Sequence, residues 1–404
     1  MTAVMEVMPI LSALKRNKVG ALLMALQIAL TLAVVANALS VIRRHWTDMS
    51  RPSGLDETNI FSLQNQWVGQ PKDLYARIQT DVAALRSLPG VVDAEATNSF
   101  PLSGWVYTWG IRLNNKQANS SIQTSLYMDT SHGLAAQGLR LIAGRWFTTD
   151  EVVEWNQGKS VPSVVLTAAL AKRLFPDGHA LGGTVYVLDD SPMRIVGIVA
   201  QASSGSGSGA EYVDLSTFVP VQFVNNLMLY VVRTKPGQQS AVMHKAKQRL
   251  LDISRVRIVD SIQPFSESRT KAFAVATATS WLLGTVCALL LVITACGTVG
   301  LTMLWVGQRR RQIGMRRALG ARRIDILSYF HTENLLIAGT GALLGIAGGL
   351  GANLWLAKHL AMTRMSPAYI VIGALIVLLL SQLAVLWPAI RAAAVPPSLA
   401  ARGL

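Results

Sequence analysis

Seven arginines and no acidic residue lie between Arg309 and Arg323, a segment that separates two long apolar stretches of the chain. Guanidinium groups bind anionic lipid head groups, and cationic loops beside membrane spans remain in the cytoplasm. The segment also holds Gly314 and Gly320 within a short helix-forming sequence, so it is more than a solvated run of charge. We therefore expect a structured cytoplasmic loop that meets a partner.

One carboxyl group, Glu333, falls about two turns into the third apolar stretch, beside Asn334. A carboxylate at that depth is costly and needs a partner. Two interpretations are open. Glu333 pairs with an arginine of the 309–323 segment and supports it, or its side chain extends to the inner membrane interface.

No constellation for catalysis, cofactor binding or metal binding is present in the sequence. A Gly-x-x-x-x-Gly-Lys-[Ser/Thr] phosphate-binding loop and a Gly-x-Ser-x-Gly nucleophile turn are both absent. The six histidines stand apart, with no pair at metal-ligand spacing. The acidic pairs Asp150-Glu151 and Asp189-Asp190 fall in predicted turns, where solvation explains them. We therefore expect no catalytic, cofactor-binding or metal-binding residue in this chain.

The composition predicts a membrane protein. Hydrophobic residues make up 51% of the 404-residue chain and charged residues only 15%. The apolar residues gather in four stretches, each longer than the roughly 20 residues that cross a bilayer. These stretches are Val19–Ile42, Phe273–Val306, Ile326–Ala357 and Ala368–Ile390. We expect four transmembrane helices in a 1+3 arrangement, with a large extracytoplasmic α+β domain inserted between helices 1 and 2.

The net charge of +15 reports orientation and contact with membrane lipid, not nucleic-acid binding. Residues 43–270 carry 22 Lys or Arg against 19 Asp or Glu, so most of the excess flanks the apolar stretches. Basic residues precede the first stretch and follow the second and fourth, which predicts that both termini and the central loop are cytoplasmic. Arg43, Arg44, Lys358 and Arg364 fall on the other side and weaken this asymmetry without reversing it.

These predictions divide the chain into nine parts. They are a cytoplasmic amphipathic lead-in (1–18), transmembrane helix 1 (19–42), the extracytoplasmic domain (43–270), a stalk with transmembrane helix 2 (271–306), a cytoplasmic elbow (307–325), transmembrane helix 3 (326–357), a short outer loop (358–367), transmembrane helix 4 (368–390) and a cytoplasmic tail (391–404). The lead-in is either an amphipathic helix on the inner surface or a frayed tail. A cleaved secretory signal is the alternative for the first span, but its apolar run is longer than a signal core and favours an uncleaved anchor.

The extracytoplasmic domain mixes both hydrophobic periodicities and predicts an α+β fold in two lobes. Expected helices are 74–88, 167–175, where Thr167 is the cap, and 241–253. Expected strands are 91–96, 107–113, 163–166, 194–199 and 227–233. The stretch 273–306 would extend about 50 Å as one helix, too long for one bilayer core, so we expect it to continue as a stalk.

Small residues in the third span recur four apart, at Gly341, Gly345 and Gly349. This spacing allows the backbones of two membrane helices to approach closely. The alternative is the general enrichment of glycine in membrane spans.

These features resemble one family. Arg311-Gln312-Ile313-Gly314-Met315-Arg316-Arg317-Ala318-Leu319-Gly320-Ala321, followed by Asp325-Ile326-Leu327 and Glu333, is similar to the cytoplasmic elbow of MacB-like/FtsX-like ABC-transporter permeases. The segments Gly144-Arg145-Trp146-Phe147, Val164–Phe175 and Val196-Gly197-Ile198-Val199 resemble its periplasmic core domain. Leu14–Lys18 and Trp387–Ala393 resemble the family's sequences before the first span and at the end of the last.

The resemblance implies a dimer of such subunits, the second being the same chain or a paralogue, on two ATPase subunits in the bacterial inner membrane. ATP and Mg would bind the ATPase, with no cofactor on this chain and with a periplasmic adaptor as a further partner. Nothing nucleotide-binding precedes the first span, so we expect the ATPase on a separate chain. The ATPase-coupling surface would comprise Arg311, Ile313, Gly314, Arg316, Arg317, Ala318, Leu319, Gly320, Ala321 and Arg322, supported by Glu333.

The expected function is that of a non-catalytic permease subunit. Through mechanotransmission it would couple ATP hydrolysis to a change in the periplasmic domain, for export of a hydrophobic compound, a peptide or a lipid-linked cargo. The alternative is a transmembrane signalling or scaffold protein that activates a cell-wall hydrolase without transport. A membrane-anchored enzyme is disfavoured because no reacting group has a partner in the sequence.

Overall fold

The computed structural model describes residues 18–394 except 70, 105, 116–121, 156–159, 189–190, 205–212 and 360–365. The expected lead-in (1–18) therefore lies outside the described residues except for Lys18, and so does most of the short outer loop (358–367) and of the tail (391–404). Asp189-Asp190 lies wholly outside them. The chain forms two compact units. The α+β unit contains residues 47–276, and the helical unit combines the residues before and after them.

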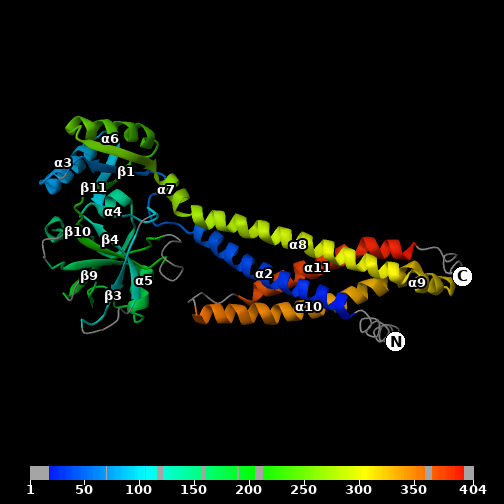
Figure 1. The fold of residues 1–404 in the computed structure, drawn as a ribbon. Coiled ribbons are helices and arrows are strands. Elements are labelled where there is room, and N and C mark those ends of the chain that lie inside the picture. Colours follow the sequence, from blue (N-terminus) through cyan, green and yellow to red (C-terminus); the bar gives the residue numbers. More distant parts are fainter. Residues whose placement is uncertain are drawn as a thin grey trace. The chain divides into compact units, whose positions relative to one another are not determined.

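The helical unit contains four helices that, within the described residues, are long and apolar enough to cross a membrane. They are α2 (Lys18–Ser50), α8 (Ala274–Gln308), α10 (Arg323–His359) and α11 (Pro367–Ala393), with the short α9 (Arg310–Ala318) between α8 and α10. Figure 1 shows the four long helices gathered into one bundle. The prediction of four membrane helices in a 1+3 arrangement around an α+β domain is confirmed.

The helices extend beyond the apolar stretches that predicted them. The first was expected to end at Ile42, but α2 continues to Ser50 and stops just before Arg51-Pro52. Hydropathy shows only the apolar part of a helix. Polar residues with adequate helix propensity can extend the helix further, and it ends where a proline disfavours the helical conformation of the preceding residue. For the same reason α10 begins at Arg323 rather than 326, and α11 ends at Ala393 rather than 390. Helix α8 is continuous over 35 residues, about 52 Å.

Close backbone contacts join α10 to α2. A Cβ atom on Gly341 would lie 2.6 Å from the carbonyl oxygen of Ala25, and one on Gly345 would lie 2.8 Å from that of Ala29. A Cβ on Gly349 would lie 3.7 Å from the nearest α2 atom, an ordinary contact. Gly341 and Gly345 are therefore the positions where the absence of a side chain permits the two helices to approach.

Polar side chains also join the helices in the bundle. Thr31 of α2 and Thr294 of α8 place their hydroxyl oxygens 2.8 Å apart. Asn334 of α10 donates from Nδ2 to the Ser381 hydroxyl of α11 at 2.9 Å. In an apolar solvent such hydrogen bonds hold neighbouring helices together, because the polar groups have few other partners.

The first sheet of the α+β unit is antiparallel and has the strand order β12-β1-β11-β2. Its strands are β1 (Ile60–Trp67), β2 (Val91–Thr97), β11 (Leu227–Thr234) and β12 (Arg257–Pro264). Helices α3 (Leu74–Arg86) and α6 (Gln239–Ile253) cover one face, where they pack against Phe61, Leu63 and Tyr230 (Figure 1). A buried ion pair, Arg257 Nη1 to Asp81 Oδ2 at 2.8 Å, ties α3 to β12.

The second sheet is mixed and eight-stranded, with the path β3-β4-β10-β7-β9-β5, while β6 pairs with β10 and β8 with β9. Its strands are β3 (Tyr107–Ile111), β4 (Ile122–Asp129), β5 (Leu141–Gly144), β6 (Val153–Glu154), β7 (Ser163–Thr167), β8 (Thr184–Val185), β9 (Met193–Val199) and β10 (Ser216–Gln222). The remaining helices are α4 (Gly133–Gln137), the 3-10 helix η1 (Thr149–Glu151), α5 (Ala168–Leu174) and α7 (Phe265–Ala272). The two sheets are the cores of the two lobes that the sequence predicted.

Thr167 is the N-cap residue of α5, as the sequence predicted, but its side chain does not cap the helix. Its hydroxyl makes no capping hydrogen bond to α5 and instead donates to the carbonyl oxygen of Asp214 at 2.8 Å. Thr167 ends β7 beside the start of β10, so the Asp214 carbonyl just before β10 competes with the helix for the hydroxyl proton.

The two lobes meet where β2 ends beside β4. The side-chain oxygen Oδ1 of Asn98 accepts a hydrogen bond from the Met128 amide at 2.8 Å. The Thr97 hydroxyl lies 3.0 Å from the Met128 carbonyl oxygen. Two side chains at the end of one sheet thus satisfy the backbone of a strand in the other, which fixes the lobes at this point.

Candidate coupling site

Helix α9 is held between two long helices by a tight reversal of the chain. After Ala318, the amide of Gly320 donates to the Arg317 carbonyl at 3.2 Å and that of Ala321 to the Arg316 carbonyl at 3.1 Å. These two bonds form a Schellman motif, which requires a left-handed residue after the cap. Gly320 supplies it with a φ of +98°. The glycine thus ends α9 and turns the chain toward α10.

The inner face of α9 is apolar and packs on the bundle. Ile313 and Gly314 are buried, and Ile313 belongs to a core cluster with Val306 of α8, Phe330 of α10 and Val385 of α11. The expectation placed both residues on the coupling surface. Because both are buried, they lie on the side of α9 that packs against the membrane helices, and their part in coupling stays a prediction.

Arginines fasten α9 at both of its ends. Arg309, directly before the helix, places Nη1 2.8 and 2.9 Å from the two carboxylate oxygens of Glu333 in α10. Arg317 donates from Nη1 to the carbonyl oxygen of Ala393 in the last turn of α11, at 2.9 Å. A cation there also offsets the negative end of the α11 dipole. Glu333 therefore pairs with an arginine of the 309–323 segment, one of the two arrangements that the sequence left open.

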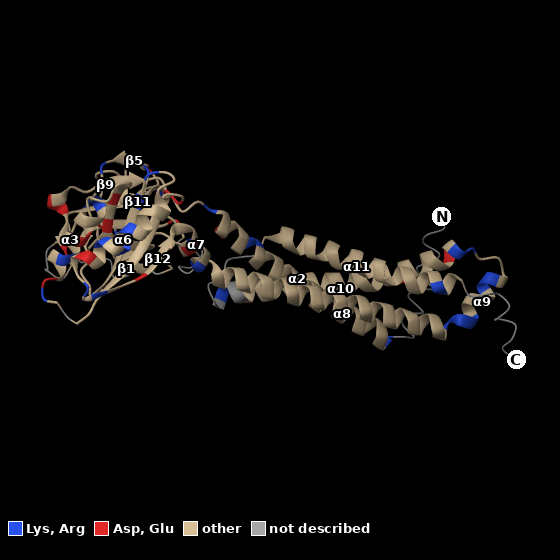
Figure 2. Ribbon diagram, turned by 90° about the horizontal axis from the view of Figure 1, so that it is seen from above, with Lys and Arg blue, Asp and Glu red and all other residues tan. Residues whose placement is uncertain are grey.

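The outer face of α9 is cationic with apolar side chains between the charges. Figure 2 shows Lys and Arg residues gathered around α9, whereas most of the long helices carry neither charge. Of the expected coupling residues, Ala321 and Arg317 are half-buried. The exposed ones are Arg311, Arg316, Ala318, Leu319, Gly320 and Arg322.

Two apolar residues of this face were missed by the sequence prediction. Met315 is 53% exposed and Ile324 is 69% exposed, beside Leu319 at 84%. An apolar residue inside an arginine-rich turn is a signal for a contact surface, because solvation alone would favour polar side chains there. We call Met315, Leu319, Ile324 and the exposed arginines 311, 316 and 322 the α9 face.

The described residues contain no group of three or more His, Cys, Asp or Glu side chains able to hold a metal ion. The arrangement around α9 is instead that of a contact surface, with a fixed backbone, an apolar patch and a surplus of positive charge.

Comparison with known proteins assigns both units. The family described as the MacB-like periplasmic core domain matches residues 21–249, and the family described as the FtsX-like permease C-terminal matches residues 284–397. The first therefore covers more than half of the chain, and the second contains α9 and the whole described α10–α11 segment.

Similar proteins carry related names. The macrolide export ATP-binding/permease protein MacB of Chromobacterium violaceum is 26% identical over 370 residues, covering 88% of this chain and 53% of that protein. The MacB protein of Hyphomonas neptunium is 29% identical over 230 residues, covering 54% of this chain and 34% of that protein. The chain thus spans about half or less of the length of these relatives.

Among solved structures, the periplasmic region of MacB from Actinobacillus actinomycetemcomitans is 18% identical, with a TM-score of 0.33, and the match covers 53% of this chain and 93% of that one. The family assignment rests on these two matches, which follow each other along the chain and together include most of its four long helices. This chain belongs to the MacB-like/FtsX-like family of ABC-transporter permeases.

Proposed function

We propose that the chain couples ATP hydrolysis by an ABC ATPase to a conformational change of its periplasmic core domain, and that the α9 face is the surface on which the ATPase docks. The observation that carries the proposal is the contrast between the two faces of α9. Its inner side is fastened by Ile313, Arg309 and Arg317, whereas Met315 and Leu319 are exposed among arginines. A helix fastened in this way would pass a displacement on to α8 and α10 rather than absorb it.

The orientation that this function needs is supported by charge. The arginines near α9 favour the cytoplasmic side, which would place the α+β unit on the periplasmic side of the inner membrane and both termini in the cytoplasm. Single cysteines at Arg249 on α6 and at Arg322, after replacement of Cys287 and Cys296, would report the topology. In intact cells an impermeant maleimide should label the first and not the second.

Cargo export is supported by the names of the relatives. Proteins named for macrolide export match most of this chain, which favours efflux of a hydrophobic compound over hydrolase activation. A second permease subunit and a periplasmic adaptor would complete the transporter. Transport of a labelled compound in vesicles would distinguish export from mechanical signalling to a hydrolase. The signalling function predicts coupled ATP hydrolysis without movement of the compound.

The coupling role is tested by charge and polarity changes on the α9 face. The chain is co-expressed and co-purified with an ABC ATPase subunit from the same genome, and hydrolysis is measured in lipid nanodiscs. Arg316→Glu and Leu319→Asp should lower recovery of the complex and its coupled hydrolysis severalfold. Arg249→Glu, an exposed charge reversal on α6, is the matched control and should leave both unchanged. Full assembly and hydrolysis in the two α9 variants would refute the docking role.

A further inference from the structure

The periplasmic core domain contains a cavity of about 490 Å³ against the sheet face opposite α3 and α6. Strand alternation builds its floor. Phe61 and Leu63 of β1 point toward α3 and α6, so Ser62 and Gln64 point the other way. Strand register then places Leu229 of β11 opposite Gln64 and Thr97 of β2 opposite Leu229. The cavity has the volume of a small-molecule site, which is about 300–1,000 Å³.

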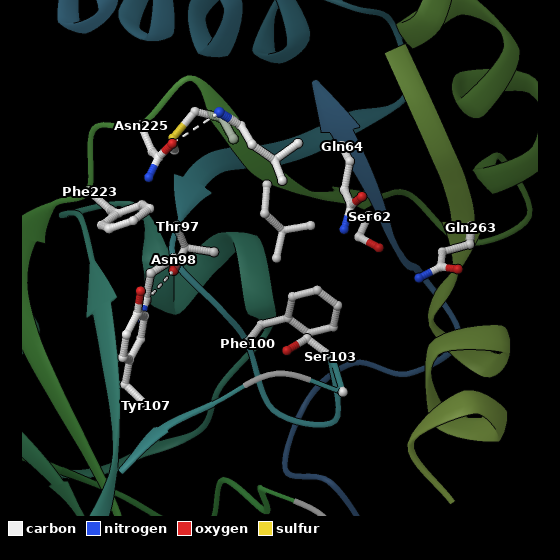
Figure 3. A pocket seen from close by; sticks show the side chains of 14 residues that line it. Ser62, Gln64, Thr97, Asn98, Phe100, Ser103, Tyr107, Phe223, Asn225 and Gln263 are labelled. Atoms are coloured by element: carbon white, nitrogen blue, oxygen red, sulfur yellow. Dashed lines mark hydrogen bonds between the residues drawn. The ribbon is translucent and has the colours of Figure 1, made fainter. Parts of the chain in front are cut away.

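Loops between the lobes supply the walls. The segment after β2 contributes Asn98, Phe100 and Ser103, β3 contributes Tyr107, and the connection from β10 to β11 contributes Phe223 and Asn225. Figure 3 shows Asn98, Tyr107 and Phe223 toward one side of the cavity and Ser62, Gln64 and Gln263 toward the other. Residues from both lobes therefore surround the same space.

The lining is apolar and polar but not charged. Phenylalanine, leucine and methionine side chains alternate with amides and hydroxyls, and none of the described lining residues is an acid, a lysine or an arginine. A charged ligand would lose its hydration here without gaining a counter-charge. A purely hydrocarbon ligand would leave the amides and hydroxyls without partners. The lining fits a neutral molecule with both apolar surface and oxygen atoms.

Asn98 lines the cavity and has one hydrogen-bonding atom without a partner among the described residues. The side chain is 9% exposed, and its Oδ1 accepts a hydrogen bond from the Met128 amide at 2.8 Å. Because an N–H group must face an oxygen, the Met128 contact identifies Oδ1 and leaves Nδ2 as the other atom. That buried Nδ2 has no hydrogen-bond partner among the described residues. A buried N–H without a partner is costly, so an acceptor supplied by a ligand would satisfy it.

We propose that this inter-lobe cavity binds a neutral, partly apolar molecule that presents a carbonyl, ether or hydroxyl oxygen to Asn98 Nδ2. The cavity would be the periplasmic capture site of the transporter, a role that rests on the proposed export function. Binding itself does not require the ATPase, so the two proposals can fail separately.

The test uses isothermal titration calorimetry of the full chain in detergent with erythronolide B, a neutral and oxygen-rich macrolactone, as the probe. Leu229→Trp fills the cavity and should abolish binding. Asn98→Asp keeps the acceptor for the Met128 amide but loses the Nδ2 donor, and it should weaken the Kd about tenfold. Ile258→Trp, an exposed change on β12 of the same sheet, is the matched control and should bind like the unsubstituted chain.

Each result decides the proposal. Equal binding by the unsubstituted chain and Leu229→Trp would place the probe elsewhere and overturn the site. No heat of binding to the unsubstituted chain at millimolar probe would overturn the ligand class. If Leu229→Trp is poorly folded, Asn98→Asp and Thr97→Val still test the lining. Loss of binding in the cavity variants with intact ATPase coupling supports the cavity independently. Intact probe binding together with normal coupling in the α9 variants would refute only the docking role.

Discussion

The guanidinium of Arg309, between α8 and α9, contacts both carboxylate oxygens of Glu333 in α10, at 2.8 and 2.9 Å. The Glu333 side chain is 2% exposed and that of Arg309 is 13% exposed. The pair therefore joins the end of α8 to α10 at a point nearly three turns after α10 begins. Removing either partner would leave a charge in a poorly solvated place.

We predict that this pair is strongly coupled. Arg309→Gln and Glu333→Gln should each destabilise the purified chain by about 3 kcal/mol, because each leaves one buried group without its partner. The double variant should lose less than the sum, by about 1–3 kcal/mol. Unfolding of all three variants in mixed micelles measures this difference. Arg310→Gln removes a neighbouring exposed charge and should change stability by no more than about 0.5 kcal/mol. Strictly additive losses would contradict the coupling.

We predict that glycine is needed at position 320 because of its backbone conformation, and not because a larger side chain would clash. Its φ is +98°, and nothing lies within 4 Å of an added Cβ. Gly320→Ala should therefore cost about 1–2 kcal/mol and loosen the end of α9. Gly320→Asn should cost less, because asparagine tolerates the left-handed region better.

Thermal unfolding and ATPase coupling of these variants check the prediction. Gly300→Ala is the control, since Gly300 lies within α8 with equally open space but without a positive φ. A loss in Gly300→Ala as large as that in Gly320→Ala would argue against the conformational cause.

The packing of α10 on α2 gives a third prediction. Gly341→Ala places a Cβ 2.6 Å from the Ala25 carbonyl oxygen, so the helices must separate. We expect a loss of about 1–3 kcal/mol, typical of overpacking. Gly348→Ala, on the same helix with nothing within 4 Å, should be neutral. The Tm of each variant in detergent distinguishes them, and equal Tm values would mean that the two helices are not in close contact in the membrane.

The sequence predicted the helices well because their signals are local. The apolar stretches and the 3.6-residue period placed α3, α6 and α8 within a few residues of their observed ends. Strands β4 and β10 were missed for a physical reason. Every residue of β10 is buried, so no alternation is visible, and Pro220 within it lowers the strand signal.

The α9 segment was recognised by its charge, but its two faces were not separated. One isoleucine and one glycine among seven arginines form the buried stripe, too few to show a period. The sequence also did not identify which arginine of the segment pairs with Glu333. That choice depends on the angle at which α8, α9 and α10 meet. The inter-lobe cavity could not be predicted, since its residues come from five separate segments.

Two buried carboxyl groups at the lobe junction give the last prediction. Gln137 Nε2 donates to Glu95 at 2.8 Å and to Asp129 at 2.9 Å, and both acids are fully buried. Burial raises the pKa of Glu95 to about 7 and raises that of Asp129 well above its usual value. The charge of Asp93 adds to the shift of Glu95, and the charge of Glu95 adds to that of Asp129. Arg86 lowers the pKa of Glu95 only in part.

The sign of the pH effect follows from these shifts. When pH rises above about 4.5, the unfolded chain releases protons that the folded chain keeps, so stability falls until the pKa of Glu95 at about 7 is passed. The Tm of the α+β unit within the full chain should therefore be higher near pH 5 than near pH 8, by about 5 °C. Glu95→Gln cannot ionise and should reduce this difference, whereas Glu267→Gln, a change to a solvent-accessible acid on α7, should leave it as it is. A Tm that rises from pH 5 to pH 8 in the unsubstituted chain, or a Glu95→Gln variant with an unchanged difference, would show that the folded chain does not hold Glu95 protonated in this pH range.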